Sequence, residues 1–292
     1  MATLPMPAAK SSTNAPRLRS ATDAEIQFHP TPLASLDAMT AATSRPFPPH
    51  THDQYGLGVI DAGGHVSRSD RRQVEAGPGS LIFVNPGEVH DGRAIGGQSR
   101  TWRILYFDPQ LLNGLRSEIA EGDRAPLAFP FAAFQDAPLR AMLEAAYATV
   151  RGRHDLGART ACESSLLCIA DRLTSLAHQR PRRAAGASPS LQRVLRLIEA
   201  DPAAAGLTLE RLAREAGITR YQLLRAFARQ HCLPPHAYIL QRRLALARRL
   251  IRGRASLAEV AVRAGFFDQS HLTHCFARHF GVTPGRYAAA VG

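Results

Sequence analysis

The last third of the 292-residue chain contains an internal repeat, which limits the possible folds more than any other feature of the sequence. Six positions of the first copy recur 48 residues later: Leu209, Leu212, Ala213, Ala216, Gly217 and Ile218 correspond to Leu257, Val260, Ala261, Ala264, Gly265 and Phe266. After one extra residue the offset becomes 49, and Leu223, Phe227, Arg229, Pro235 and Tyr238 correspond to Leu272, Phe276, Arg278, Pro284 and Tyr287. Two copies at matched spacing predict two similar helical units.

Each copy has the pattern of a helix-turn-helix. Gly217 and Gly265 can adopt the positive φ that ends a helix within a short turn. Thr219 and Asp268 follow at the position where the side chain of an N-cap residue would begin the second helix. The repeat therefore predicts two helix-turn-helix units.

The charge of the chain is confined to the part that holds the repeat. Residues 181–292 carry 18 basic and 6 acidic side chains, whereas residues 1–180 carry 18 of each and are neutral. Packing of helices would explain the apolar positions of the repeat but not this excess of 12 positive charges. A basic domain joined to a neutral one indicates a polyanionic partner for one half and a different task for the other.

The rest of the chain divides into segments of different pattern. Residues 1–24 lack hydrophobic periodicity, and we expect a flexible arm there. Short apolar runs at 55–60, 80–84 and 101–107 alternate with Gly- and Pro-rich turns, which predicts a small antiparallel barrel or sandwich over residues 25–135. Residues 136–180 have helical periodicity and are expected to cover the barrel or to pair across a dimer. Residues 181–190 form an expected linker, and residues 191–292 the basic helical domain.

Several classes of protein are excluded by the sequence. No segment approaches the about 18 consecutive apolar residues of a membrane span, and the N-terminus has no apolar core of a secretory signal. The four cysteines lack metal-binding spacing and are expected to be reduced thiols of a cytosolic protein: Cys162, Cys168, Cys232 and Cys275. There is no Ser-His-Asp triad, phosphate-binding loop or pair of catalytic carboxylates, so we expect no enzymatic activity.

Residues 191–290 resemble the DNA-binding domain of the AraC/XylS family of bacterial transcription regulators. The second copy, Ser256 to Tyr287, follows the signature segment of that family at Gly265-Phe266, Asp268-Gln269-Ser270, Phe276, Phe280-Gly281 and Pro284. The resemblance implies two helix-turn-helix units joined by a long helix at about Pro235 to Arg252. Both recognition helices would then enter successive major grooves, about 10 base pairs apart.

The resemblance and the helical spacing together give a set of candidate DNA-binding residues. They are Arg220, Tyr221, Leu224, Arg225, Arg229, Arg243, Gln269, Ser270, His271, Thr273, His274 and Arg278. Arg225 is the candidate for a bidentate guanine contact, and His274 stands where the family usually has arginine. Phosphate contacts are expected for Arg229, Arg242, Arg243, Arg278 and Arg286, although a solvated helix face would also account for each of them.

The β region contains a second group of candidate residues. His50 and His52 occur in PPHTHDQY, and Glu88 and His90 occur in NPGEVHDG, a turn that resembles the cupin-like ligand-binding domain of AraC/XylS regulators. Trp102 and Tyr106 alternate along the last strong strand and are expected on the same wall of a pocket. The predicted effector-binding residues are therefore His50, His52, Glu88, His90, Trp102 and Tyr106.

A metal site is the alternative interpretation of these histidines. Cupin enzymes hold a divalent metal with a His-x-His pair, a Glu and a later His. Here the Glu expected about four residues after His52 is absent, because Tyr55, Gly56 and Leu57 stand there. We therefore expect a pocket without metal or other cofactor. A third interpretation is that His50 and His52 are surface or rim residues, which would bind neither a metal ion nor an effector.

The sequence thus predicts an α+β protein of two domains, a cupin-like barrel with trailing helices and an all-α DNA-binding domain. We expect a cytoplasmic transcription regulator, and an activator because that is the commoner behaviour of the family. Its expected partners are promoter DNA, a small-molecule effector, RNA polymerase and a second copy of the chain, with no membrane. The alternatives are a metal-dependent cupin enzyme fused to a DNA-binding domain, which metal analysis would identify, and a structural DNA-binding protein without an effector.

Overall fold

The computed structural model describes residues 25–69, 72–119, 127–152, 156–179, 189–231 and 233–291. The expected N-terminal arm, most of the expected linker and Cys232 lie outside these residues. The strands are β1 (Glu25–His29), β2 (Leu36–Thr43), β3 (Phe47–His50), β4 (Tyr55–Ala62), β5 (His65–Ser69), β6 (Arg72–Ala76), β7 (Leu81–Val84), β8 (His90–Ala94), β9 (Arg100–Phe107) and β10 (Ala133–Phe134), with a short 3-10 turn at Ile95–Gly97. The helices are α1 (Pro109–Ile119), α2 (Ala137–Arg151), α3 (Leu156–Gln179), α4 (Pro189–Ala200), α5 (Leu209–Ala216), α6 (Arg220–His231), α7 (Pro235–Arg252), α8 (Leu257–Arg263), α9 (Gln269–Phe280) and α10 (Pro284–Val291).

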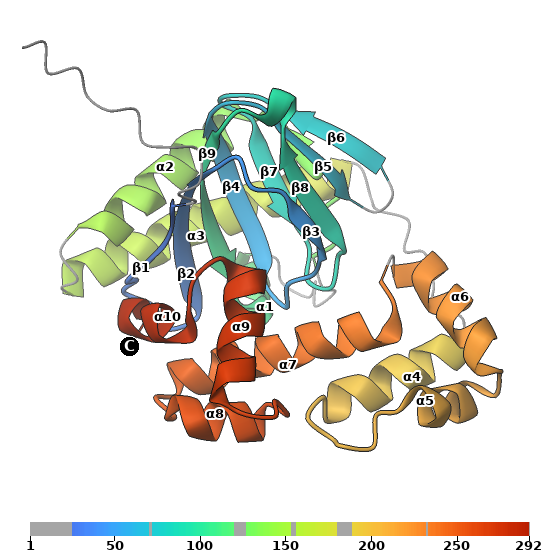
Figure 1. Ribbon diagram of the computed structural model, residues 1–292. Helices are drawn as coiled ribbons and strands as arrows, with labels where there is room; N and C mark the ends of the chain where they lie inside the picture. Colours follow the sequence, from blue (N-terminus) through green and yellow to red (C-terminus); the bar gives the residue numbers. More distant parts are fainter. Residues whose placement is uncertain are drawn as a thin grey trace, which may run out of the picture.

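The strands form two antiparallel sheets, which face each other as a sandwich (Figure 1). One sheet has the order β1-β2-β9-β4-β7-β10 and the other the order β3-β8-β5-β6. The predicted strands at 55–60, 80–84 and 101–107 are confirmed as β4, β7 and β9. The expected α+β fold is therefore confirmed, with two separate sheets in place of one closed barrel.

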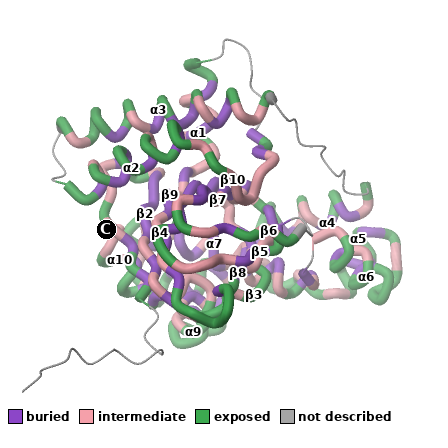
Figure 2. Tube along the Cα trace, turned by 90° about the horizontal axis from the view of Figure 1, so that it is seen from above, coloured by how far each residue is buried: buried purple, intermediate pink, exposed green. Residues whose placement is uncertain are grey.

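Alternation along β9 gives the large sheet two apolar faces. Leu105 is fully buried and belongs to one apolar core with Leu143 of α2 and Ile169 of α3. Its neighbour Ile104 points to the opposite face, toward the other sheet, because successive side chains of a strand alternate. Buried and exposed segments also alternate along α2 and α3 (Figure 2), as expected for helices that cover a sheet with one face.

Two contacts hold the covering helices in place. The side chain of Asp136 caps α2 by accepting a hydrogen bond from the backbone of Leu139 at 2.8 Å. The same carboxylate accepts a hydrogen bond from Arg172 of α3 at 2.6 Å. Helix α1, which the sequence pattern did not predict, packs beside α3. Among the described residues, no helix combines the length and the apolar character needed to cross a bilayer.

The C-terminal domain has the predicted double helix-turn-helix. Gly217 and Gly265 have φ values of +68° and +79°, and they end α5 and α8 as the repeat predicted. Thr219 accepts a hydrogen bond from the backbone of Gln222 at 3.2 Å, and Asp268 accepts one from the backbone of His271 at 2.7 Å. The 18 residues of α7 join the two units, which at 1.5 Å per residue gives a helix about 27 Å long.

The two units differ in their apolar cores. The first unit has a core of its own, in which Leu212, Leu223 and Phe227 pack on α4 and α7. In the second unit Leu272 and Phe276 belong to a core that continues into the sandwich and includes Ile26 of β1. Figure 1 shows the same difference: α9 and α10 lie beside the strands, whereas α5 and α6 lie at the other end of α7.

Candidate functional site

A cavity of about 90 Å³ lies between the two sheets. This volume is enough for several water molecules or a small ligand. Its walls are largely aromatic and aliphatic, and they include Phe47, Met39 and Trp102. The second helix-turn-helix unit closes one side of the cavity, because Arg248 of α7 and the last two residues of α9 also line it: His279 and Phe280.

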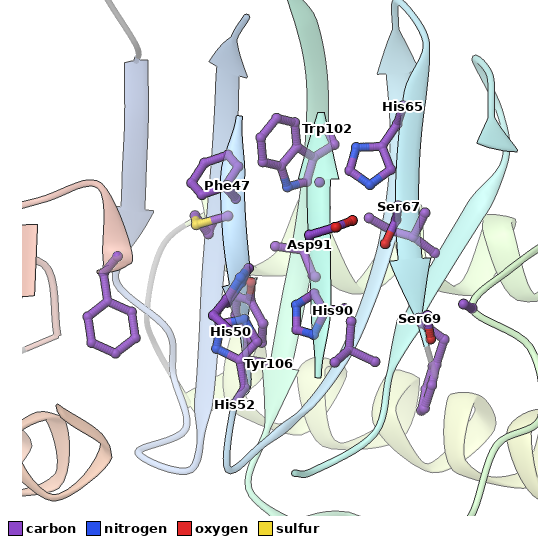
Figure 3. Close-up of a pocket in the computed structure, with 18 of the residues that line it drawn as sticks. Phe47, His50, His52, His65, Ser67, Ser69, His90, Asp91, Trp102 and Tyr106 are labelled. Carbon is purple, nitrogen blue, oxygen red and sulfur yellow. The ribbon is translucent and has the colours of Figure 1, made fainter. Parts of the chain in front are cut away.

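Three histidines gather at one end of this cavity (Figure 3). His50 ends β3 and His90 begins β8, and the antiparallel pairing of these strands sets the two residues opposite each other. Strand β3 ends at His50, so His52 lies in the loop before β4. The ring centre of His52 is nevertheless 4.9 Å from that of His50 and 5.1 Å from that of His90. The ring centres of His50 and His90 are 4.3 Å apart.

A fourth histidine approaches this group from the DNA-binding domain. The ring centre of His279 in the last turn of α9 is 5.5 Å from that of His50 and 6.0 Å from that of His52. Gly281, which ends α9 with a φ of +77°, packs against Ile26 so closely that a Cβ atom there would overlap the isoleucine. The close approach of α9 to β1 therefore depends on this glycine.

Backbone carbonyls fix the protonation of two of the rings. Nδ1 of His50 is 2.8 Å from the carbonyl oxygen of Pro48, and Nδ1 of His90 is 3.1 Å from that of Glu88. A carbonyl oxygen can only accept, so each Nδ1 carries the proton and donates it. The Nε2 atoms of both histidines therefore keep their lone pairs for a ligand.

Burial also keeps the four rings uncharged. The rings are half-buried in the cavity wall, and burial lowers the pKa of His50 and of His279 to about 3 and that of His90 to about 4. Burial, with the neighbouring imidazoles, lowers the pKa of His52 well below its usual range. Near pH 7 the cluster thus consists of neutral imidazoles, which can accept hydrogen bonds or ligate a metal ion.

The structure brings together most of the predicted effector-binding residues. His50, His52, His90, Trp102 and Tyr106 all line the cavity, and the ring of Tyr106 is 5.1 Å from that of His52.

Glu88 does not fit its predicted place in the pocket. Its buried carboxylate accepts hydrogen bonds from the side chain of Asn85 at 2.6 Å and from the hydroxyl of Ser69. Asn85 in turn donates to the carbonyl of Phe129 and accepts from its backbone N–H. Glu88 therefore stabilises the turn before β8, since its acceptor atoms are used within the protein.

Sequence reasoning missed the residues through which the two domains meet. Asp37 of β2 is 1% exposed, and its carboxylate accepts hydrogen bonds from Arg252 of α7 and, at 3.2 Å, from the hydroxyl of Tyr287 in α10. Arg248 of α7 donates to Gln54 and Asp53 of the loop before β4. A buried carboxylate requires such partners, but those of Asp37 lie 215 and 250 residues away in the chain and carry no local signal.

Neighbouring polar contacts extend this interface. Gln241 of α7 accepts a hydrogen bond from the backbone of Thr51 at 2.8 Å, directly before His52. Burial by itself would raise the pKa of Asp53, but the adjacent arginines at 248, 249 and 242 lower it below its usual range. Some arginines of α7 therefore form contacts with the sandwich, although their positive charge would also favour DNA.

The candidate DNA-binding residues of α6 form an exposed group. Tyr221 is 68% exposed and Leu224 36% exposed, while Leu223 and Phe227 are fully buried on the opposite side of the helix. The guanidinium of Arg225 lies 5.7 Å from the centre of the Tyr221 ring. The side chains at 220 and 229 are also exposed.

The candidate residues of α9 divide between its two ends. Gln269, Ser270, His271 and His274 are exposed, and Thr273 is half-buried and donates to the carbonyl of Gln269. Near the other end, the side chain of Arg278 is exposed, but its carbonyl accepts a hydrogen bond from Arg45 at 3.3 Å. The first half of α9 is therefore free for a partner, and the last turn contacts the sandwich.

Arg243, for which a phosphate contact is predicted, makes two hydrogen bonds within the domain. This side chain is half-buried and donates to the carbonyls of Pro202 and Gly265, both at 2.8 Å. It thereby ties the loop before α5 to the turn of the second unit. Its guanidinium is used to join the two helix-turn-helix units.

Two family models match the chain in the order that the fold implies. Residues 40–170 match the AraC-like ligand binding domain, and residues 212–290 match a helix-turn-helix domain. The first match covers the sandwich from β2 and most of α3, and the second covers both recognition helices.

Known proteins with both or one of these domains are similar to the chain. The HTH-type transcriptional regulator YbfI of Bacillus subtilis is 26% identical over 228 residues, which are 77% of this chain and 81% of YbfI. The virulence regulon transcriptional activator VirF of Yersinia enterocolitica is 34% identical over 82 residues, 28% of this chain and 30% of VirF. The structure of unsaturated fatty acid-bound ToxT from Vibrio cholerae shares the fold with a TM-score of 0.55 and 12% identity, covering 94% of this chain and 98% of ToxT. The chain belongs to the AraC/XylS family of bacterial transcription regulators, with an AraC-like ligand-binding domain followed by a double helix-turn-helix.

Proposed function

We propose that this regulator activates transcription by placing α6 and α9 in successive major grooves, under the control of a small ligand in the cavity of the sandwich. One observation carries the proposal: α9 has exposed side chains at its first turns and a cavity-lining histidine, His279, in its last turn. A ligand that changes the cavity would therefore act directly on a recognition helix. Such differential contact between two sites is what allosteric control requires.

The DNA contact is supported by exposure and charge. Arg225 projects from α6 beside Tyr221, and its planar guanidinium can donate to both acceptors of a guanine. The length of α7, about 27 Å, is of the order of the one-turn separation between successive major grooves. The exposed arginines at 229 and 278 are placed to contact phosphates, which fix the position of the protein without reading sequence.

The remaining features of the proposal follow from the family and the relatives. VirF is named as a transcriptional activator, which supports recruitment of RNA polymerase by this chain as well. We assign the protein a non-catalytic role in the cytoplasm, where promoter DNA is found. A homodimer through residues 136–180 is supported by the outer face of α3, on which Leu167 is 37% exposed.

Mapping of the genomic sites bound by the full-length protein tests the proposal. We expect promoter sites in which two segments about one helical turn apart are protected on one side of the DNA. Affinity for these sites should fall by about 0.9 log units per log unit of salt for each phosphate that the protein neutralises. Affinity that does not depend on salt, or promoters whose transcription does not respond to the protein, would contradict it.

A further inference from the structure

We propose that His50, His52, His90 and His279 bind one divalent transition-metal ion, which joins recognition helix α9 to the β-sandwich. The inference rests on the proposed function, because it assigns a ligand to part of the same cavity. It replaces the expectation of a metal-free pocket, which the missing glutamate of the cupin pattern had favoured.

The spacing of the rings is the first argument. One ring nitrogen of each of His50, His52 and His90 lies within 4.8 Å of the other two. Imidazoles that bind one ion tetrahedrally at about 2.1 Å have nitrogens about 3.4 Å apart and ring centres about 5 Å apart. In the structure, the ring centres of His50, His52 and His90 are 4.3–5.1 Å apart, and that of His279 is 5.5 Å from His50 and 6.0 Å from His52. His279 lies outside the group of three whose nitrogens are within 4.8 Å of one another, so ligation would draw the last turn of α9 closer to the sandwich.

The orientation of the rings is the second argument. His50 and His90 each donate Nδ1–H to a backbone carbonyl, which leaves Nε2 as the ligating atom. Histidines that bind metal ions are usually held in this way by an outer hydrogen bond. The two residues also stand opposite each other on paired strands, so that the sandwich holds them rigidly before an ion binds.

The chemistry of the donors selects the class of ion. Four neutral imidazoles offer nitrogen ligands alone, which suit zinc, nickel, copper or ferrous iron and not magnesium or calcium. Two carboxylates flank His90 in the sequence: Glu88 is occupied by Asn85 and Ser69, and Asp91, which also lines the cavity, accepts a hydrogen bond from the backbone of Arg68 at 2.6 Å. The site therefore differs from the histidine–glutamate set of cupin enzymes, and the fourth ligand comes from the other domain.

The contribution of His279 gives the ion a regulatory consequence. The repeat offset of 49 residues places Gln230 at the corresponding position of the first unit. A glutamine amide is a far weaker ligand for these ions than imidazole. An ion bound at the cluster would hold the second unit against the sandwich, whereas the first unit supplies no ligand.

The experiment titrates Co²⁺ and Zn²⁺ into the full-length protein after removal of metal with a chelator. We expect one ion per chain, with the strong visible absorption of four-coordinate Co²⁺. His90→Gln should weaken binding by at least about 100-fold, more than the loss of an outer-shell partner. His279→Gln, which gives the second unit the residue of the first, should weaken it by about 10–100-fold and change the Co²⁺ spectrum, because water replaces an imidazole. His236→Gln, an exposed histidine of α7, is the matched control and should bind like the unchanged protein.

A second measurement separates ligation from loss of folding. Far-UV circular dichroism should be the same for all variants, and Zn²⁺ should raise the melting temperature of the unchanged protein and of His236→Gln but not of His90→Gln. Zn²⁺ should also slow hydrogen exchange in α9 of the unchanged protein and leave it unaltered in His279→Gln.

Two results would overturn the inference. One is the absence of saturable, equimolar Zn²⁺ or Co²⁺ binding by the unchanged protein. The other is binding and spectra that stay the same in His279→Gln, which would remove the link between the domains. Sequence-specific DNA binding is measured on the same samples: if it persists without any metal binding, the inference fails and the proposed function stands. Equimolar metal binding without specific DNA binding would support the inference and contradict the proposed function.

Discussion

The two helix-turn-helix units have the same repeat but different surroundings. Phe227 of the first unit and Phe276 of the second are both fully buried at matching positions. Phe227 packs within its own unit, whereas Phe276 belongs to the core shared with the sandwich. The repeat thus preserves how each pair of helices packs internally, and residues outside the repeat pattern decide what each unit contacts.

This difference separates the tasks of the two recognition helices. Among the described residues, helix α6 supplies none to the cavity, although its last turns line a separate cleft with the sandwich through Ala228 and Arg229. Helix α9 contacts the cavity through His279 and is tied to β1 by the close packing of Gly281 on Ile26. Regulation is therefore expected to act more directly on the second unit than on the first.

The comparison is tested most strongly by truncating the two matched phenylalanines. Each of Phe276→Ala and Phe227→Ala should lower the free energy of unfolding of its own core by about 3–5 kcal/mol. Trp102, the single tryptophan of the chain, lies in the cavity wall and reports on the sandwich. In urea unfolding, Phe276→Ala should shift both the Trp102 fluorescence and the far-UV circular dichroism transitions. Phe227→Ala should shift only the circular dichroism, and an equal shift of the fluorescence would show that the two cores unfold as one.

The charged contact between the domains gives the next largest effect. Asp37→Asn removes the buried carboxylate to which Arg252 and Tyr287 donate, and it should cost about 3 kcal/mol because the arginine loses its counter-charge. Hydrogen exchange should become faster in α9 and α10 but not in α6. Asp61→Asn is the matched control, since Asp61 pairs with Arg103 within the sandwich at 2.7 Å. Faster exchange in α6 as well would mean that both units depend on the interface.

Base reading by the first unit is tested by Arg225→Ala. The loss of a bidentate guanine contact should cost about 1–3 kcal/mol on the operator and flatten the preference at one or two base pairs. Binding is measured over a series of single-base operator variants, with Arg196→Ala of α4 as the control outside both recognition helices. If Arg225→Ala loses affinity equally on every variant, the side chain contacts phosphate and the proposed orientation of α6 is wrong.

The smallest effect is expected for His274→Arg in α9. His274 is exposed at the position that corresponds to Arg225, and the change restores the cation that the family usually has there. The variant should bind DNA more tightly by up to about 1 kcal/mol, with a larger gain on sites that carry guanine opposite the new side chain. Weaker binding in the same operator series would indicate that α9 enters the groove in a different register from α6.

Local patterns predicted much of the fold. The strands β4, β7 and β9 and the turns at Gly217 and Gly265 were visible because alternation, helical period and positive φ are properties of neighbouring residues. Helix α1 was not predicted, because the helical period was visible only from residue 136 onward.

The site was predicted less completely than the fold. His50, His52, His90, Trp102 and Tyr106 line the cavity because they lie on or beside strands whose faces alternate regularly. Glu88 belongs to a turn, where the spacing of residues in the sequence does not determine the direction of a side chain. Its carboxylate accepts a hydrogen bond from Asn85. Arg243 was predicted to contact phosphate because it is a basic residue of the DNA-binding domain. In the folded chain it donates hydrogen bonds to the carbonyls of two loops that lie beside it.

The sequence by itself determined the two domains, the repeat, the charge of the C-terminal domain and the type of pocket, since each depends on residues close together in the chain or on composition. Only the tertiary structure decided that the second unit closes this pocket. Asp37 and Tyr287 are 250 residues apart, and His50 and His279 are similarly distant. Such contacts form because certain apolar faces bury each other and certain buried charges are paired. The free energy of these interactions depends on the whole packed chain, so that no single segment of the sequence reveals it.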